Sequence, residues 1–308
     1  ETRIAELKKV IASKKRPTVP ISHNCKKPYE CPLKKDCWSS LPEGNVFELS
    51  RGGKKSHDLF DQGIVLIKDI PKEVDLTLNQ GLQHQCACTG KPHICKESIS
   101  KFLNKLKYPL YYLDFETFNP AIPLYNGTHP YQRIPFQFSL HIVQENGATE
   151  HISFLAEGQS DPRKKFLKAL KSSLGTEGSI IVFYQIFEQG LMKELATSFP
   201  EYLNWVASLD NRWLDLFKPF KNFHYYHPKQ KGSASIKKVL PAVTGKGYDG
   251  MYIADGMTAS IKYAEAEFGA CSQTERKKVR KALEKYCGLD TEGMIWIIDE
   301  LKRFKIDE

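Results

Sequence analysis

The sequence lacks the features that would direct the chain into or across a membrane. It has no run of about 18 apolar residues, so no conventional membrane-spanning helix is expected. Its first residues, ETRIAELKKVIASKKR, lack the apolar core of a signal peptide. We therefore expect a cytoplasmic protein with no membrane partner.

Further absences bear on how the chain is organised. The sequence contains no internal repeat and no low-complexity tract. It does not begin with Met, so we expect a fragment or a processed product, with part of the machinery upstream. Its 308 residues leave room for one large domain or two ordinary ones.

The composition is that of a globular protein with an excess of basic residues. Hydrophobic residues make up 41% and charged residues 26% of the chain, which are ordinary values for a globular protein. The formal net charge of +9 favours a polyanionic partner such as nucleic acid, although a merely soluble basic protein would carry the same charge. Eight cysteines in a cytosolic type of chain indicate reduced thiols or metal ligands rather than disulfides.

The residue pattern divides the chain into three regions. Residues 1–50 are irregular, rich in Lys and Pro, and hold three of the cysteines. Residues 51–107 form a connecting region, in which GIVLIKDI is predicted as a short strand and KESISKFLNKLK as a helix. Residues 108–308 have regular periodicity and form the main domain.

The main domain begins with three predicted strands. PLYYLDFETF is predicted as a buried strand. IPFQFSLHIV alternates Phe136, Phe138 and Leu140 with polar residues, which predicts a half-buried strand. HISFLA is the third, and the Asn146-Gly147 pair before it marks a hairpin turn.

Helices and a fourth strand follow. Asp161 is the expected N-cap of a helix with Pro162 at its first position. The apolar stripe of that helix consists of Phe166, Leu167, Leu170 and Leu174. SIIVFY is a continuous apolar strand of the kind that is covered on both faces, and EQGLMKELATSF is a helix. This order predicts an α/β fold with a mixed sheet flanked by helices.

Two carboxylates lie at the end of the first strand of the main domain. Asp114 and Glu116 are two residues apart, so both side chains lie on one face. Carboxylates this close repel unless a proton or a cation lies between them, and hard oxygen ligands suit Mg²⁺ or Mn²⁺. A pair of solvated acids at a strand end would have the same sequence.

Two later segments supply further candidates. Glu188 in FEQGL lies where the strand SIIVFY gives way to a helix, a position that projects a side chain at the rim of the sheet. Tyr286 and Asp290 in YCGLD are four residues apart on the predicted helix RKKVRKALEKYCGLDTEG, so they share a face.

Together these segments resemble the three motifs of the DnaQ-like exonucleases, in particular the branch with Tyr in the third motif. The resemblance covers Tyr108 to Lys305 and implies a ribonuclease H-like fold. It also implies that two divalent ions are held by Asp114, Glu116, Glu188 and Asp290.

The resemblance assigns individual roles as well. Asp114 would bridge the two ions, and Tyr286 would orient the attacking water, since a phenol is a poor base at its usual pKa. The sequence departs from the family pattern at two positions. Glu188 stands where the family usually has Asp, and Tyr184 stands where it usually has Asn.

Two segments rich in aromatic and basic residues are candidate substrate contacts, namely PLYNGTHPYQRIPFQF and YYHPKQKGSASIKKVLP. Aromatic rings stack on unpaired bases and cations hold phosphates. The alternative is a structured loop with packed aromatic rings, or a solvated basic loop. The residues predicted to contact substrate are Tyr125, Tyr131, Arg133, Phe136 and Lys237.

The first region contains a regular cysteine pattern. Cys25, Cys31 and Cys37 have five residues between neighbours. Structural zinc sites use pairs about two to four residues apart, so this wider spacing favours an iron–sulfur cluster held by four thiolates over Zn²⁺. Three unrelated thiols are the alternative.

This cysteine segment resembles the C-terminal cysteine loop of RecB-like nucleases, in which three late cysteines join an earlier one to hold a [4Fe–4S] cluster. LDFET, YHP, GSASIKKVLP and YCGLD resemble an uncharacterised bacterial family that fuses such a nuclease to a DnaQ-like domain. The resemblance implies an upstream nuclease domain that contributes the fourth ligand. Within the chain, His23, Cys86 or Cys88 could take that place, although HQCACTGKPHIC otherwise reads as ordinary thiols.

The sequence therefore predicts a divalent-metal-dependent 3′→5′ exonuclease that acts on single-stranded ends of DNA or RNA. Two other classes stay open. One is a nucleic-acid-binding accessory domain with a decayed site, and the other is an iron–sulfur scaffold for a partner.

Overall fold

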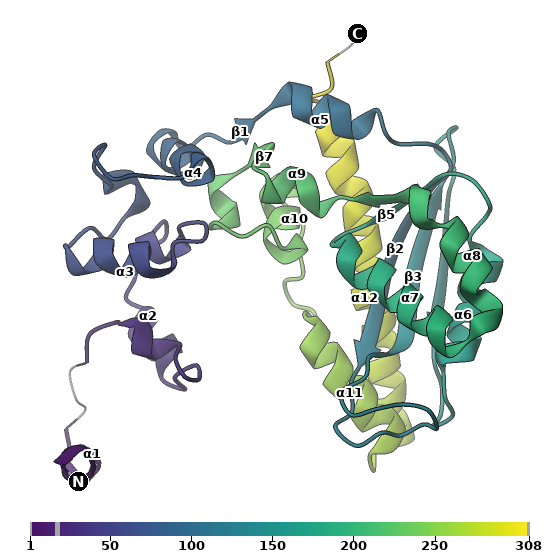
Figure 1. Cartoon of the computed structure of the whole chain (residues 1–308), viewed down its shortest axis with the longest axis horizontal. Helices are drawn as coiled ribbons and strands as arrows, with labels where there is room; N and C mark the ends of the chain where they lie inside the picture. The colour runs from purple at the N-terminus through teal and green to yellow at the C-terminus, as the bar shows by residue number, and fades with distance from the viewer. Residues whose placement is uncertain (1, 16–18, 307–308) are drawn as a thin grey trace.

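The computed structural model describes residues 2–15 and 19–306. The predicted regions also include Glu1, 16–18 and 307–308, which lie outside the described residues. Figure 1 shows two parts, which we call the arm (the described residues up to 92) and the body (residues 93–306). No helix in the described ranges is long and apolar enough to cross a membrane.

The body is built on a mixed five-stranded sheet of order β4-β3-β2-β5-β6. The pairs β2–β3 and β3–β4 are antiparallel, whereas β2–β5 and β5–β6 are parallel. All four strands predicted for the main domain are present. The strands are β2 Leu110–Phe118, β3 Ile134–Val143, β4 Thr149–Leu155, β5 Ser179–Val182 and β6 Trp213–Asp215.

Helices cover both faces of this sheet (Figure 1), which confirms the predicted α/β arrangement. One face packs against α6, α7 and α8 around buried Phe115 and Leu191. The other packs against α12 around buried Tyr112 and Ile297. The helices of the body are α5 Lys96–Leu103, α6 Arg163–Ser173, α7 Gln185–Ser198, α8 Leu203–Ser208, α9 Phe217–Lys221, α10 Ile236–Thr244, α11 Gly256–Phe268 and α12 Gln273–Lys302.

Local signals at the ends of these elements are largely confirmed. Gly147 has φ +85° in the turn between β3 and β4, as the Asn-Gly pair predicts. Helix α6 begins at Arg163, one residue later than predicted, and Asp161 Oδ1 accepts a hydrogen bond from the Arg163 N–H at 3.0 Å. The predicted apolar stripe of α6 is buried against the sheet.

The expectation that β3 is half-buried is wrong. Its polar residues Gln137 and Ser139 are as buried as its apolar ones, because α12 covers that face. The helix also supplies their hydrogen-bond partners. Gln137 Nε2 donates to the Leu283 carbonyl at 3.0 Å, and the hydroxyls of Ser139 and Thr291 lie 2.7 Å apart.

The arm differs from prediction at GIVLIKDI, which does not form a strand. Only an isolated bridge joins Leu66 to Asn45, and a 3₁₀ turn follows at Ile67–Asp69. These apolar residues instead fill a small core with Val46 and Leu59, under helices α3 and α4. The helices of the arm are α1 Thr2–Ala12, α2 Lys34–Trp38, α3 Gly53–Asp61 and α4 Leu78–Thr89, so residues 1–50 are less irregular than expected.

The predicted boundary at residue 107 falls inside the body. Strand β1, His93–Ile94, pairs with β7, Tyr225–Tyr226, and α5 buries Ile99 against α12. The helix predicted from KESISKFLNKLK is thus confirmed, but it belongs to the core. The periodic pattern that starts at residue 108 could not reveal this, because the partners of α5 lie more than a hundred residues later in the chain.

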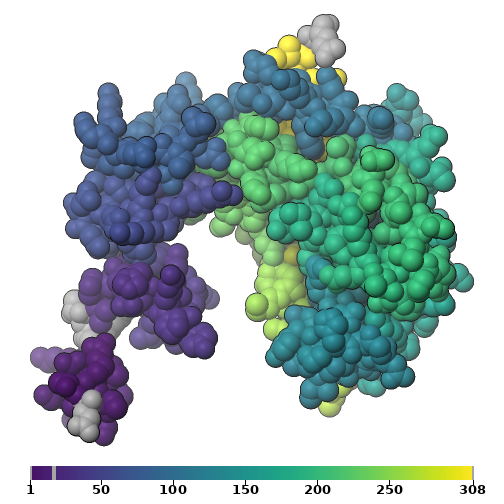
Figure 2. Space-filling model, in the orientation of Figure 1, coloured from purple at the N-terminus to yellow at the C-terminus, as the bar shows by residue number. Residues whose placement is uncertain are grey.

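The arm is joined to the body through the loop after β7. Gly232, at φ +72°, lies so close to the arm that an added Cβ would be 2.0 Å from the Glu48 carbonyl oxygen. Gln83 Nε2 donates to the same carbonyl at 2.8 Å, and Lys231 forms an ion pair with Glu43. Figure 2 shows that the surface is hollowed beyond this junction, between the arm and the body.

Candidate metal centre

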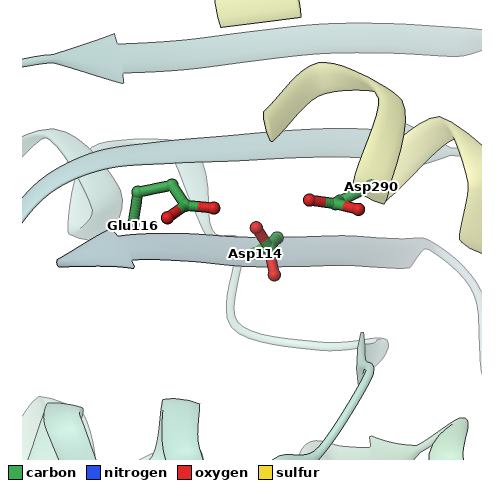
Figure 3. A group of neighbouring side chains, drawn as sticks. All are labelled: Asp114, Glu116 and Asp290. Atoms are coloured by element: carbon green, nitrogen blue, oxygen red, sulfur yellow. The ribbon is translucent and has the colours of Figure 1, made fainter. Parts of the chain in front are cut away.

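Three carboxylates from two elements meet on the face of the sheet that α12 covers. Asp114 and Glu116 come from β2, and Asp290 comes from α12. One ligand oxygen of each lies within 4.8 Å of those of the other two, and no other described set of three such side chains is this close. Figure 3 shows the three carboxyl groups facing one another between the strand and the helix.

The local sequence explains why these side chains converge. Strand alternation puts Asp114 and Glu116 on one face, and helical spacing puts Tyr286 and Asp290 on one face of α12. Gly293, one turn further on, lets α10 approach closely. An added Cβ there would be 2.9 Å from Leu240 Cδ2 on α10.

Burial raises the pKa of all three acids, and repulsion between them raises the pKa of Asp114 and Glu116 further. For Asp114 the causes are burial and then the charge of Asp290, and for Glu116 they are burial and then the charge of Asp114. Burial raises the pKa of Asp290 to about 6, against hydrogen bonds from Tyr248 and Tyr286 and the charge of Lys237. A cluster of this kind favours either protons or a bound cation.

Glu188, the fourth predicted acid, lies beside this group but outside its 4.8 Å limit. It is only 3% exposed, in the first turn of α7. Burial raises its pKa, and the charge of Asp114 is the next cause. Among the described residues, no hydrogen-bond donor reaches its Oε2. A buried carboxylate oxygen without a donor fits a cation, and the all-oxygen set suits Mg²⁺ or Mn²⁺.

Two tyrosine hydroxyls contact Asp290, the acid that α12 contributes. Tyr286 was predicted from its spacing, and its hydrogen bond lowers the pKa of Asp290 against the effect of burial. The hydroxyl of Tyr248 donates to Asp290 Oδ1. Sequence reasoning missed Tyr248, because it lies in the irregular segment between α10 and α11, where no spacing signals a site.

Other neighbours complete the surroundings of the acids. The charge of Lys237 on α10 lowers the pKa of Asp114, and its Nζ lies 5.4 Å from the centre of the Tyr286 ring. Lys237 thus lies beside the acids, and its contact with substrate stays a prediction. Cys287 was missed although it follows Tyr286. Its buried thiol donates to Asp114 Oδ2 at 3.5 Å.

The other predicted substrate contacts have different surroundings. Phe136 is wrong as a substrate contact, because it is fully buried and stacks on Tyr263 with ring centres 3.9 Å apart. Tyr125 packs against the same core, and its hydroxyl is buried. Tyr131 is 68% exposed, and Arg133 forms an ion pair with Glu194 beside the Phe187 ring. Only these last two remain available at the surface.

The three predicted cluster cysteines lie in the segment 25–37 of the arm. The Cys31 N–H donates to the Cys25 carbonyl at 3.0 Å, and Cys37 lies on α2. Their thiols do not form a set within 4.8 Å, as a zinc ion with Zn–S bonds of about 2.3 Å would need. The larger iron–sulfur cluster stays a prediction.

Cys86, Cys88 and Cys95 of the second cysteine segment have other surroundings. Cys86 is buried against Phe223 and Tyr226, and Cys88 lies 3.6 Å from the His84 ring. Cys95 donates to the Ser98 hydroxyl at 3.1 Å. The packing of Cys86 removes it as a candidate fourth cluster ligand.

Comparison with known proteins finds relatives whose names give no activity. Residues 111–235 match the family described as "Domain of unknown function (DUF2779)", a range that includes Asp114, Glu116 and Glu188 and ends before Asp290. The chain is 30% identical over 215 residues to the uncharacterized protein MG366 of Mycoplasma genitalium, which covers 63% of this chain and 32% of that protein.

A second relative is the uncharacterized protein UU173 of Ureaplasma parvum, 27% identical over 228 residues, or 66% of this chain and 32% of that protein. A third is the MG366 homolog of Mycoplasma pneumoniae, 27% identical over 221 residues, or 65% of this chain and 33% of that protein. The chain thus spans about a third of the length of these curated relatives. No solved structure matches it.

Proposed function

We propose that the body is a divalent-metal-dependent nuclease that removes nucleotides in the 3′→5′ direction from single-stranded ends of DNA or RNA. The observation that carries this proposal is the convergence of Asp114, Glu116 and Asp290, whose ligand atoms lie within 4.8 Å of one another. The carboxylates come from a strand and a distant helix, so their meeting is a property of the fold.

The electrostatics favour a bound cation over a merely structural acid pair. Buried carboxylates with raised pKa values destabilise the folded chain unless a charge compensates them. Asp114, Glu116 and Asp290 would hold the metal, with Glu188 beside them. Two such ions, when bound, supply the charge that stabilises the attacking and leaving oxygens of a displacement at phosphorus.

The arrangement of the sheet supports a ribonuclease H-like identity for the body. Strands β2, β3 and β4 pair in antiparallel fashion, and β5 and β6 then add to the sheet parallel to β2. The first strand of the sheet in the chain, β2, is central in the order β4-β3-β2-β5-β6. This is the strand order that the resemblance to DnaQ-like exonucleases implies. The polarity of cleavage in our proposal rests on that resemblance.

The surrounding side chains fit supporting roles. Burial and the charge of Asp290 raise the pKa of Tyr286 far above its usual range, so its hydroxyl keeps its proton. Tyr286 would therefore hold a water by hydrogen bonding and would not deprotonate it. Lys237 is a cation beside the acids that could contact a substrate phosphate.

The test is degradation of 5′-labelled single-stranded DNA and RNA in Mg²⁺ and in Mn²⁺. We expect products shortened from the 3′ end, no products in chelator, and a loss of at least about a thousandfold in Asp114→Asn. Glu150→Gln, an exposed acid on β4, is the matched control and should retain activity. Metal-dependent cleavage that persists in Asp114→Asn and Asp290→Asn would refute the proposal, and shortening from the 5′ end would refute its polarity.

A second candidate function is nucleic-acid binding without cleavage. Glu188 and Tyr184 favour it, because they replace the Asp and Asn that the resemblance leads one to expect. Tight binding of the labelled strands with no turnover in Mn²⁺ would support this function instead.

A further inference from the structure

Tyr184 is a large aromatic residue in a backbone conformation that it does not favour. It has φ +98° and ψ 67° at the N-cap of α7, in a left-handed region that a bulky residue seldom adopts. Two contacts hold it there. The Tyr184 N–H donates to Asp215 Oδ1 at 3.1 Å, and the Phe187 N–H donates to the Tyr184 carbonyl at 3.0 Å.

Core packing does not explain why a tyrosine occupies this position. The residue is 44% exposed, and Ile186, two residues later, is 69% exposed. Asn would suit both the left-handed conformation and the N-cap better. Backbone strain that is kept at an exposed residue is typical of positions whose side chain binds a ligand.

The position of Tyr184 links it to the candidate metal centre. The parallel pairing of β2 and β5 places Tyr112 beside Ile181, so the two strands end at the same edge of the sheet. Strand β5 ends at Val182, and Tyr184 follows two residues later. Glu188 lies one helical turn, about 5.4 Å of rise, beyond Tyr184 on α7. Tyr184 therefore lies at the edge of the sheet toward which β2 carries Asp114 and Glu116.

A second ring and a cation extend this surface. The edge of Phe217 meets Tyr184 with ring centres 5.4 Å apart and planes at 84°. Lys221, exposed at the other end of α9, has its Nζ 5.6 Å from the centre of the Phe217 ring. Aromatic rings beside an exposed cation are typical of proteins that bind single strands, since the rings stack on bases and the cations contact phosphates.

We propose that Tyr184, Phe217 and Lys221 form a platform that binds an unpaired base within the last few nucleotides of a strand whose end enters the metal centre. The inference rests on the proposed nuclease function for its geometry. Stacking on the exposed Tyr184 ring requires a base that has left its own helix, so the platform selects single-stranded over paired ends.

Binding can be measured apart from cleavage in the Asp114→Asn background of the full chain. The probe is a 5′-fluorescein oligothymidylate of about twelve nucleotides, followed by fluorescence anisotropy, together with the same oligonucleotide carrying abasic sites at its last three positions. Tyr184→Ala should weaken binding of the oligothymidylate about tenfold, and Tyr184→Phe should restore it. The abasic probe should bind weakly to Tyr184→Ala and to Tyr184→Phe alike.

Two further variants separate stacking from structure and from charge. Tyr184→Asn should raise the melting temperature because it relieves the backbone strain, and yet weaken binding as Tyr184→Ala does. A merely structural tyrosine would show the opposite change in stability. Lys221→Gln should weaken the binding of both probes by the same factor. It should also reduce the salt dependence of binding by about one counterion.

Tyr29→Ala is the matched control, an 85% exposed tyrosine of the arm, and should bind as the parent does. The platform is refuted if the parent does not bind the probe, if Tyr184→Ala binds it as the parent does, or if the abasic probe binds equally well. Absence of cleavage by the wild-type chain, with Tyr184-dependent binding intact, would refute the nuclease function and leave the platform standing.

Discussion

At the scale of the residue, the candidate site consists of buried acids held by neutral donors. Asp290 accepts a hydrogen bond from the Tyr248 hydroxyl, and Asp114 accepts one from the Cys287 thiol. Groups that orient a metal ligand in this way affect metal binding nearly as much as the ligands do. Tyr248 is therefore the residue whose removal should most affect the geometry of the site without removing a carboxylate.

Tyr248→Phe tests this role. Loss of its hydroxyl leaves Asp290 Oδ1 without that donor, so we expect turnover to fall roughly tenfold or more and the metal concentration for half-maximal activity to rise. The KM for the oligonucleotide should change little. Tyr252→Phe is the control, because its hydroxyl donates to Glu275 at the surface, at 3.1 Å. Unchanged metal dependence in Tyr248→Phe would exclude a positioning role.

The sequence predicted those site residues whose spacing is regular and missed those on irregular segments. Asp114 with Glu116, and Tyr286 with Asp290, follow strand and helix periods, so each pair could be placed on one face in advance. Tyr248 comes from a loop whose path depends on how α10 and α11 pack. Phe136 failed as a substrate contact because an aromatic strand residue is equally compatible with a core.

At the scale of the element, the contact between α10 and α12 brings Lys237 to the acids. Gly293 on α12 has Leu240 of α10 directly above it, so the two helices approach more closely there than larger residues would allow. Displacing α10 would move Lys237 and the chain that leads to Tyr248. The site thus depends on one position that has no side chain.

Gly293→Val should destabilise the folded chain by about 1–3 kcal/mol through overpacking, because its Cβ alone would lie 2.9 Å from Leu240 Cδ2. Gly288→Ala in the same helix is the matched control, since its nearest neighbour would be 3.8 Å away, at His151. That substitution should stabilise by up to about 1 kcal/mol. Denaturant unfolding followed by circular dichroism measures both, and equal effects would contradict the packing argument.

The predicted β3–β4 hairpin was confirmed, whereas the strand predicted for GIVLIKDI has no strand partner in the described part of the arm. The alternation in β3 and the Asn-Gly pair mark a hairpin that closes within the segment itself. GIVLIKDI has the same apolar character, but in the arm only Leu66 forms a bridge, so its side chains pack as a loop. The burial of Gln137 on β3 depends on α12, which local periodicity cannot reveal.

At the scale of the whole molecule, the raised pKa values imply that the metal-free chain is less stable at neutral pH than it could be. Asp290 has a pKa of about 6 when folded, against a usual value of 3.8. The folded state therefore binds more protons than the unfolded state between these pH values. Stability falls as pH rises through this window, and the loss is complete above about pH 6.

Asp290→Asn removes this charge. In chelator at pH 7.5, we expect the variant to be more stable than the wild-type chain by up to about 3 kcal/mol, and the advantage should shrink as the pH is lowered to 4. Added Mn²⁺ should stabilise the wild-type chain and not the variant. Urea unfolding at several pH values measures the difference, and a variant less stable than wild type at pH 7.5 would contradict the electrostatic argument.

Because of the acid cluster, the concentration of divalent ions should also affect the lifetime of the protein in the cell. An ion that binds only the folded chain stabilises it in proportion to the logarithm of its free concentration. Chains that fold while Mg²⁺ or Mn²⁺ is scarce would keep three carboxylates within 4.8 Å of one another without a compensating charge, and would open more often to proteases. We therefore expect the abundance of this protein in cells, and not only its turnover, to follow the divalent-ion concentration.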